Sequence, residues 1–344
     1  MANPKPDAVR AMLYPNHLTC VLLFDRRLSG LGDVVRDFVR IASMRSDAAF
    51  QVTDTDDDRF YRLADPADSL SVRADYIDRP ANAQVLQSAL ASAYTAIVTP
   101  DIRNRVVACE SHVMFSVGHD PAGEDPDPPA PVATQTLFEQ RLANLALISR
   151  IMIDHAMPVA VHWGQSDTLI SGAVFDDWAA RGEMPGVLHI HPHLFGPDAE
   201  PGAQSLAGFR TQGAANWLGR EVIVQPNVLP WTANLAIVSG FVREASRPGA
   251  AVPAHGSTLG TAEPGFTCRI LHHEAGDETE HAEGGEPLFE IIPVQQLAPT
   301  TASADGAASG HAQPISPAQT GAPARFSALG RRPAMPRPFG RKVT

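Results

Sequence analysis

The sequence predicts an α+β fold in which helices pack on a mixed β-sheet, and three observations predict it. Apolar runs of strand length alternate with segments of helical periodicity. Strand–helix–strand order occurs at least twice, over residues 18–52 and 112–163. The predicted strands also outnumber the helices that would be needed to link them all in parallel.

Two apolar runs predict central strands in the first half of the chain. Leu18–Phe24 and His112–Val117 are continuous and apolar, which suits strands that are buried on both faces of a sheet. The other elements predicted here are a helix through Val34, Val35, Phe38 and Ile41, strands at Ala48–Val52 and Leu70–Ile77, and a short helix at Val85–Tyr94.

The second half opens with a predicted helix and strand. Thr136 and Glu139 have the spacing of a capping box, and the helix is predicted to run to about His155. Pro158 separates it from a strand at Val159–Trp163. The remaining predicted elements are a helix at Val174–Ala180, an extended segment at Val187–Leu194, a strand at Glu221–Gln225, a helix from Trp231 to Val242, and strands at Thr267–Leu271 and Leu288–Val294.

The chain divides into an acidic body and a basic C-terminal tail. Residues 298–344 consist mainly of Ala, Pro, Ser, Thr, Gly and Arg, with six cationic residues against the single acid Asp305. The net charge is -11 for the chain and +5 for the tail, so residues 1–297 carry -16. Without apolar periodicity the tail cannot offset its ordering entropy, and it is predicted to be disordered.

The body is long enough to bury one core, and two packed subdomains over residues 1–100 and 101–297 are the alternative. Its acidity excludes a nucleic-acid groove on the body, because phosphates would be repelled. The three cysteines have no disulfide spacing. Neither a signal peptide nor an apolar run of roughly 20 residues is present, so we expect a cytoplasmic protein.

Three candidate metal ligands alternate along one predicted extended segment, namely His189, His191 and His193. Alternate residues of an extended chain share a face, so these imidazoles would point the same way. Zinc and similar metals bind imidazole nitrogen, and Asp198 or Glu200 could complete the ligand shell. Pro192 favours the other interpretation, a histidine-rich edge segment or loop without metal, because proline removes a ladder donor.

Four candidate binding residues follow a predicted strand, namely His162, Trp163, Ser166 and Asp167. Sites in α/β proteins gather at the carboxyl ends of strands, which makes a small binding pocket one interpretation. The other is a packed tryptophan followed by a turn, because sequence neighbours seldom align as a nucleophile, a base and an orienting group. Gly30 and Gly32 resemble a phosphate-binding turn, but the pattern lacks a third glycine and more simply predicts a turn before a helix.

Several short segments resemble a bacterial family catalogued as domain of unknown function 4261. They are Ala160–Ser171, with its Trp-Gly pair; His112–Met114 before the helix at 137–155; Trp217–Glu221; and the turn at Gly256–Gly260. The resemblance covers the middle and late body and implies a fold. It implies no activity.

Two hypotheses for function follow. The first is a cytoplasmic interaction or binding protein whose tail contacts an acidic protein, a nucleic acid or an anionic membrane surface. The tail residues expected to make these contacts are Arg331, Arg332, Arg337, Arg341 and Lys342. A tail that folds back on the acidic loop at 274–286 is the alternative role. The second hypothesis is a metal-dependent, hydrolase-like enzyme built on the three histidines, with a divalent metal as its cofactor.

Overall fold

The structure is a computed structural model of the full chain. The residues that it describes are 14–15, 17–45, 49–56, 58–65, 70–118, 134–196, 207–247, 249–260, 266–274 and 287–295. Residues 119–133, most of the acidic loop at 274–286 and the whole tail lie outside these residues.

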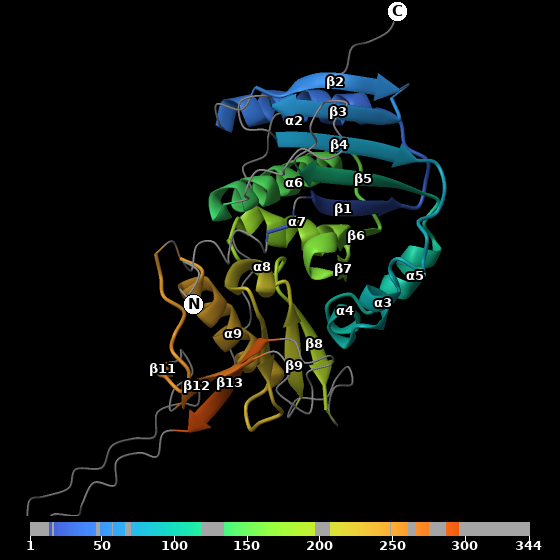
Figure 1. The fold of residues 1–344 in the computed structure, drawn as a ribbon. Helices are drawn as coiled ribbons and strands as arrows, with labels where there is room; N and C mark the ends of the chain where they lie inside the picture. Colours follow the sequence, from blue (N-terminus) through green and yellow to red (C-terminus); the bar gives the residue numbers. More distant parts are fainter. Residues whose placement is uncertain are drawn as a thin grey trace, which may run out of the picture. The chain divides into compact units, whose positions relative to one another are not determined.

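A seven-stranded sheet is the first of two sheets that the described residues form, and its order is β2-β3-β4-β5-β1-β6-β7 (Figure 1). All of its neighbouring strands pair antiparallel. Its strands are β1 (His17–Phe24), β2 (Gln51–Asp56), β3 (Phe60–Asp65), β4 (Leu70–Ile77), β5 (Ser111–Gly118), β6 (Ala160–Trp163) and β7 (Thr168–Ile170).

The second sheet has six described strands in the order β11-β12-β13-β10-β9-β8. β10 and β13 pair parallel and the other neighbours pair antiparallel, so this sheet is mixed, as predicted. Its strands are β8 (His191–Phe195), β9 (Gly208–Gln212), β10 (Glu221–Val224), β11 (Thr258–Gly260), β12 (Phe266–His273) and β13 (Leu288–Gln295).

Helices cover both sheets. They are α2 (Leu31–Arg45), α3 (Gln87–Ala91), α4 (Ala93–Val98), α5 (Ile102–Val107), α6 (Gln135–His155), α7 (Gly172–Arg181), α8 (Ala215–Leu218) and α9 (Trp231–Ala245), with a 3₁₀ turn η1 at Gly164–Ser166. In Figure 1, α2, α6 and α7 lie together along the first sheet, and α9 lies beside the second. The predicted α+β class is confirmed.

Both predicted strand–helix–strand units are present. β5 and β6 each pair antiparallel with β1, so they run parallel to each other on its two sides, and α6 connects them. The two apolar runs predicted as central strands form β1 and β5 in the interior of the order, and the strand predicted at Val159–Trp163 forms β6 beside β1. Those predictions are confirmed.

Burial on both faces is complete only at the carboxyl end of β1, and β5 is buried mainly on one face. In β1, Leu22 packs in the main core while its neighbour Leu23 packs in a second cluster with residues of α3 and α5. In β5, Val113, Phe115 and Val117 are buried and the alternating residues are only half-buried. The prediction of two-sided burial was therefore wrong for β5.

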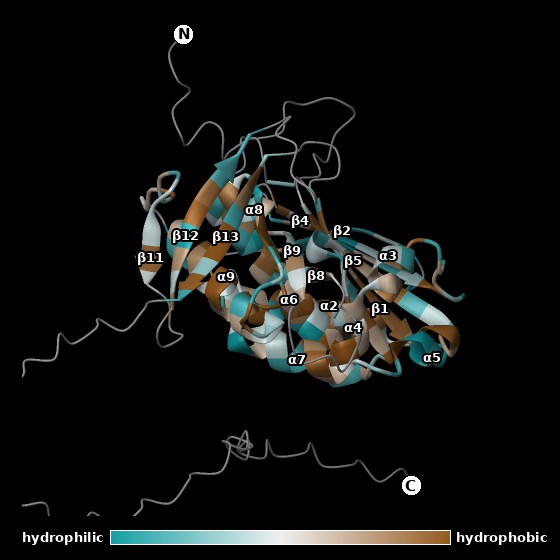
Figure 2. Ribbon diagram, turned by 90° about the horizontal axis from the view of Figure 1, so that it is seen from below, coloured by the Kyte–Doolittle hydropathy of each residue, from teal (hydrophilic) through white to brown (hydrophobic). Residues whose placement is uncertain are grey.

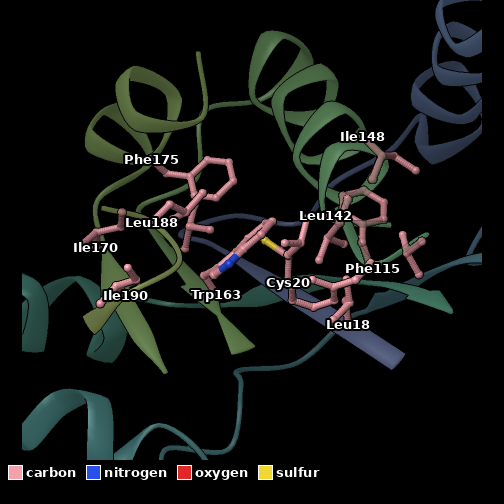
Figure 3. Packing of buried hydrophobic residues seen from close by; sticks show 14 of the residues in the cluster. Leu18, Cys20, Phe115, Leu142, Ile148, Trp163, Ile170, Phe175, Leu188 and Ile190 are labelled. Atoms are coloured by element: carbon pink, nitrogen blue, oxygen red, sulfur yellow. The ribbon is translucent and has the colours of Figure 1, made fainter. Parts of the chain in front are cut away.

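One main core extends across both sheets. Trp163 lies at its centre in Figure 3, with Phe175 and Leu188 on one side and Cys20 on the other. Trp163 and Cys20 are fully buried. The same cluster includes Trp217 of α8 and Phe289 of β13, so the two sheets share apolar packing.

Several element boundaries differ from the predictions, and three of the differences have a clear physical cause. Thr134, not Thr136, caps α6, and its side chain accepts a hydrogen bond from the N–H of Leu137. β2 extends past its predicted end at Val52 to Asp56, because this exposed edge strand leaves the carboxylates of Asp54 and Asp56 in water. The predicted helix at 85–94 is two helices, because Ser92 is extended and caps α4.

The strands of the two sheets separate between residues 170 and 191 rather than at residue 100, since β5, β6 and β7 all belong to the first sheet. Within the described part of the chain, no helix is both long enough and apolar enough to span a lipid bilayer.

Candidate functional site

The two sets of candidate residues come together where β6, β7 and β8 meet the helices α3 and α4. His162 lies on β6, and Asp167 ends the turn that follows it. His191 opens β8 and contacts residues of α4 and β7. The sequence separates these groups by more than twenty residues, and tertiary structure places them in one polar cluster.

His162 and Asp167 are joined by a hydrogen bond. His162 Nε2 lies 2.7 Å from Asp167 Oδ1, and the side chains are 10% and 15% exposed. Burial disfavours the charged carboxylate, but hydrogen bonds from His162 and Ser88 hold the pKa of Asp167 below its ordinary value. Asp167 has φ 48°, an uncommon conformation for a non-glycine residue, and its side-chain bonds help to hold it there.

A chain of four hydrogen bonds runs beside this pair. Ser166 Oγ donates to the carbonyl of Leu188 at 2.8 Å, so Thr168 Oγ1, 2.8 Å from Ser166 Oγ, must donate to it. Thr168 then accepts from His191 Nδ1 at 3.1 Å. The remaining ring nitrogen, His191 Nε2, accepts from Ser92 Oγ at 2.7 Å. The proton of His191 is thus assigned to Nδ1.

Ser92 and His191 have the hydrogen bond of a nucleophile and its base, but their surroundings do not favour catalysis. His191 is fully buried and Ser92 nearly so. Burial lowers the pKa of His191 to about 3, so the imidazole cannot readily take a proton at neutral pH. Its second nitrogen meets a hydroxyl, whereas serine hydrolases place a carboxylate there to stabilise the imidazolium. The chain of bonds ties α4, β7 and β8 together.

The three candidate metal ligands do not converge. His189 precedes β8, and its ring lies between Trp163 and Trp217, with ring centroids 5.9 and 6.2 Å away. His191 and His193 are neighbours, with centroids 4.8 Å apart, but His193 bonds to Gln212. The predicted face of three imidazoles is not formed, because the chain becomes extended only from residue 191.

Among the residues that the structure describes, no group of three or more His, Cys, Asp or Glu side chains could hold a metal ion. Asp198 and Glu200, the predicted additional ligands, lie outside those residues.

Two of the four predicted binding residues are core residues. Trp163 is fully buried and packs on Phe175 at a centroid distance of 5.6 Å, and Ser166 is buried within the hydrogen-bond chain. The alternative interpretation, a packed tryptophan followed by a turn, describes both. His162 and Asp167 retain partial exposure and are the two that a ligand could touch.

A pocket of about 450 Å³ opens between α6, α7 and the loop that joins α7 to β8. Residues of both helices and the loop line it, among them Glu139, Ala143, Leu147, Arg150, Trp178, Arg181, Glu183, Met184 and His189. Its walls are largely apolar and a few polar groups converge on it, as in small-molecule sites.

His189 is the most buried titratable group of this pocket. Its Nδ1 accepts a hydrogen bond from the N–H of Gly186 at 3.2 Å, so the neutral ring carries its proton on Nε2. Nε2 is buried and has no hydrogen-bond partner among the residues that the structure describes. Burial lowers the pKa of His189 to about 4, so the ring is neutral at physiological pH. An unpaired buried donor costs about 1–3 kcal/mol, which an acceptor at this position would recover.

The sequence contains one signal for the pocket that pattern analysis missed. Glu139, Ala143, Ala146 and Arg150 follow one another at three- and four-residue spacing, so small and charged residues share one stripe of α6. A stripe of alanines beside an apolar core face leaves room for another group. The wall opposite α6 is formed by the loop before β8, and the sequence of this loop has no hydrophobic periodicity that would predict it.

The turn at Gly30–Gly32 holds an internal carboxylate. Asp58 accepts from the N–H of Gly30 at 3.0 Å and from the N–H of Gly32 at 2.5 Å. Although burial disfavours its charge, these bonds and one from Tyr61 lower the pKa of Asp58. The protein's own side chain thus occupies the anion position at the start of α2, as the simpler interpretation of the turn requires.

Comparison of the chain with models of protein families, with curated proteins and with solved structures finds no significant match. The resemblance to domain of unknown function 4261 therefore stays a prediction.

Proposed function

We propose that the protein is a binding protein that holds a small ligand in the pocket between α6 and α7. The observation that carries the proposal is the largely apolar pocket of about 450 Å³, whose lining includes His189, a residue with a buried Nε2 that no described residue pairs with. Pockets of this size and composition are the usual sites of small ligands.

Binding accounts for the polar groups better than hydrolysis does. Ser92 and His191 are buried, and the second nitrogen of His191 bonds to the hydroxyl of Thr168 rather than to a carboxylate. The metal-dependent alternative needs three converging histidines, and His189 packs between two tryptophans instead. We therefore do not adopt the enzyme hypothesis.

The charges around the pocket favour a ligand that has both donors and acceptors. Arg150 pairs with Asp176 at 3.0 Å, and Arg181 pairs with Asp177. Glu183 is exposed and forms no ion pair with any residue that the structure describes. The rim is thus acidic on balance, and the neutral His189 is part of the lining.

A primary amide on an apolar body fits these groups. Its carbonyl would accept from His189 Nε2, and its N–H₂ would donate to Glu139 or Glu183. Its apolar part would lie on Trp178 and Leu147, which line the pocket. We take the primary amide as the ligand class.

The tail supplies a second proposed function. The separation of +5 in residues 298–344 from -16 in the rest of the chain favours contact between the tail and an acidic protein or a polyanion. Arg331, Arg332, Arg337, Arg341 and Lys342 would make these contacts. We also propose that the protein is cytoplasmic, that it is bacterial and that it is a member of the family of domain of unknown function 4261, which several of its segments resemble.

Ligand-observed NMR with phenylacetamide tests the pocket. We expect saturation transfer to the probe from the native protein and its loss in Ala143→Trp, which fills the pocket. Ala143→Ser is the matched control and should retain the signal. Equal transfer from native protein and a folded Ala143→Trp variant, or none from the native protein, would contradict the proposal.

A further inference from the structure

A second pocket lies on the other sheet, between α9 and the strands β11 and β12. It has a volume of about 400 Å³. Its lining is mostly apolar, and includes Ile237, Phe241, Leu259, Cys268, Ile270 and Ile291. Figure 2 shows hydrophobic stretches on α9 and on the neighbouring β12 and β13. The helix forms one wall, the sheet forms the floor, and β11 with the segment before it forms the opposite wall.

Gly240 opens this pocket. It lies in the interior of α9, where glycine weakens a helix relative to alanine. A Cβ atom placed on Gly240 would meet nothing within 4 Å in the described residues beyond its chain neighbours and the backbone of its own helix, so neither packing nor backbone conformation excludes a side chain there. The absent side chain leaves space directly beside the apolar floor.

The floor offers no charged or strongly polar group. Cys268 is buried there, and burial raises the pKa of its thiol to about 11, so the sulfur is uncharged at physiological pH. Ile270 and Ile291 are also buried. A molecule that fills this space therefore needs an apolar body without internal hydrogen-bonding groups.

The rim carries one cation that is available to a ligand. Arg243 is exposed and forms no salt bridge with any described residue. Glu244, the acid beside it in the pocket wall, is paired with Arg247 at 2.7 Å. Of the charged residues that line the pocket, Arg243 is therefore the one without an ion-pair partner among the described residues. Arginine is suited to carboxylates, because its planar fork can donate two parallel hydrogen bonds.

We propose that this pocket binds a small amphipathic carboxylate of the fatty-acid type, with its chain between α9 and the sheet and its carboxylate at Arg243. The apolar floor, the open position at Gly240 and the unpaired rim cation all favour this one occupant. The site is separate from the pocket between α6 and α7 and shares no lining residue with it.

Calorimetric titration of the full chain with dodecanoate, below its micelle concentration, tests the proposal. We expect one molecule bound per chain. Gly240→Leu should weaken binding by more than about tenfold, because its side chain occupies the space taken by the ligand. Gly240→Ala adds only a methyl group to open space and is the matched control. It should bind nearly as the native protein does.

Arg243→Gln tests the head group. It should weaken dodecanoate binding about tenfold, whereas Arg247→Gln, which removes a cation already paired with Glu244, should change it much less. No binding by the native chain would overturn the proposal, as would unchanged binding by a Gly240→Leu variant whose circular dichroism is native. If light scattering shows that Gly240→Leu abolishes a dimer of the native protein, a second copy of the chain is the occupant and the proposal is wrong.

Discussion

Ser92 Oγ donates a hydrogen bond of 2.7 Å to Nε2 of the fully buried His191, and so joins the start of α4 to the start of β8. The same hydroxyl oxygen accepts from the N–H of Thr95 at 3.4 Å, which caps α4. The side chain of Ser92 thus caps α4 and is also the first member of the buried chain of hydrogen bonds. The arrangement fixes the polar cluster in place without exposing it.

Ser92→Ala should lower the free energy of unfolding by about 1–3 kcal/mol, because it removes a helix cap and leaves His191 Nε2 unpaired. Urea denaturation measures this. A double-mutant cycle with His191→Gln should show coupling of at least about 0.5 kcal/mol, since the two residues touch. Ser29→Ala, at an exposed position, is the control and should have little effect. Additive effects at Ser92 and His191 would argue against the bond.

The stability of the protein should fall as the pH is lowered from about 6.5 towards 4. Burial lowers the pKa of His191 from 6.5 to about 3 and that of His189 from 6.5 to about 4. Below 6.5 the unfolded chain therefore binds protons that the folded chain does not, and unfolding is favoured. Each histidine contributes a slope of about 1.4 kcal/mol per pH unit within this window.

Urea denaturation between pH 7 and pH 4.5 measures these slopes. His191→Gln removes one titrating group, so the slope of this variant should be shallower than that of the native protein. His17→Gln changes an exposed histidine at the start of β1 and is the matched control. A slope in His191→Gln equal to that of the native protein would show that His191 does not hold a lowered pKa.

Asp58→Ala should destabilise the protein by about 1–2 kcal/mol, because three bonds from the start of α2 and Tyr61 then lose their acceptor. Asp58→Asn should cost less, since asparagine also adopts positive φ and retains one acceptor oxygen. Because the pKa of Asp58 is lowered in the folded state, the native advantage over Asp58→Asn should be lost as the pH falls through that pKa. Thermal denaturation at pH 7 and pH 3 compares the native protein with the two variants. Equal stabilities of the native protein and Asp58→Ala at pH 7 would contradict the proposed cap.

Local sequence patterns were sufficient to predict the central strands, but they were not sufficient to predict the polar cluster or the pockets. The apolar runs at β1 and β6 predicted interior positions because burial on two faces leaves a continuous hydrophobic signal. Ser92 gave no such signal: a serine inside an apparently helical segment is visible in the sequence, but its partner is 99 residues away. Contacts of that separation depend on how the sheets pack.

The histidine cluster shows the same limit more sharply. Alternation correctly placed His191 and His193 on one strand. It also placed His189 there, which is wrong because that residue belongs to the turn before β8 and packs between two tryptophans. Periodicity assumes that a segment is extended throughout, and only hydrogen-bond partners from β9 decide where the strand begins.

The tail should govern any binding to polyanions. It carries +5 while the rest of the chain carries -16, and exposed charges act over a Debye length of about 8 Å at physiological salt. The native protein should be retained on heparin at low salt, and truncation after Leu297 should abolish that retention. Retention should weaken steeply with salt, because binding releases counterions.

A charge-neutral variant separates charge from chain length. Changing Arg331, Arg332, Arg337, Arg341 and Lys342 to glutamine keeps the tail intact and should abolish retention as truncation does. Anion-exchange chromatography tests the alternative in which the tail folds back on the acids at 274–286. Both variants would then expose these acids, and they would elute later than the change in their net charge alone explains. Heparin retention that survives in both variants would assign binding to the acidic body and contradict the role of the tail.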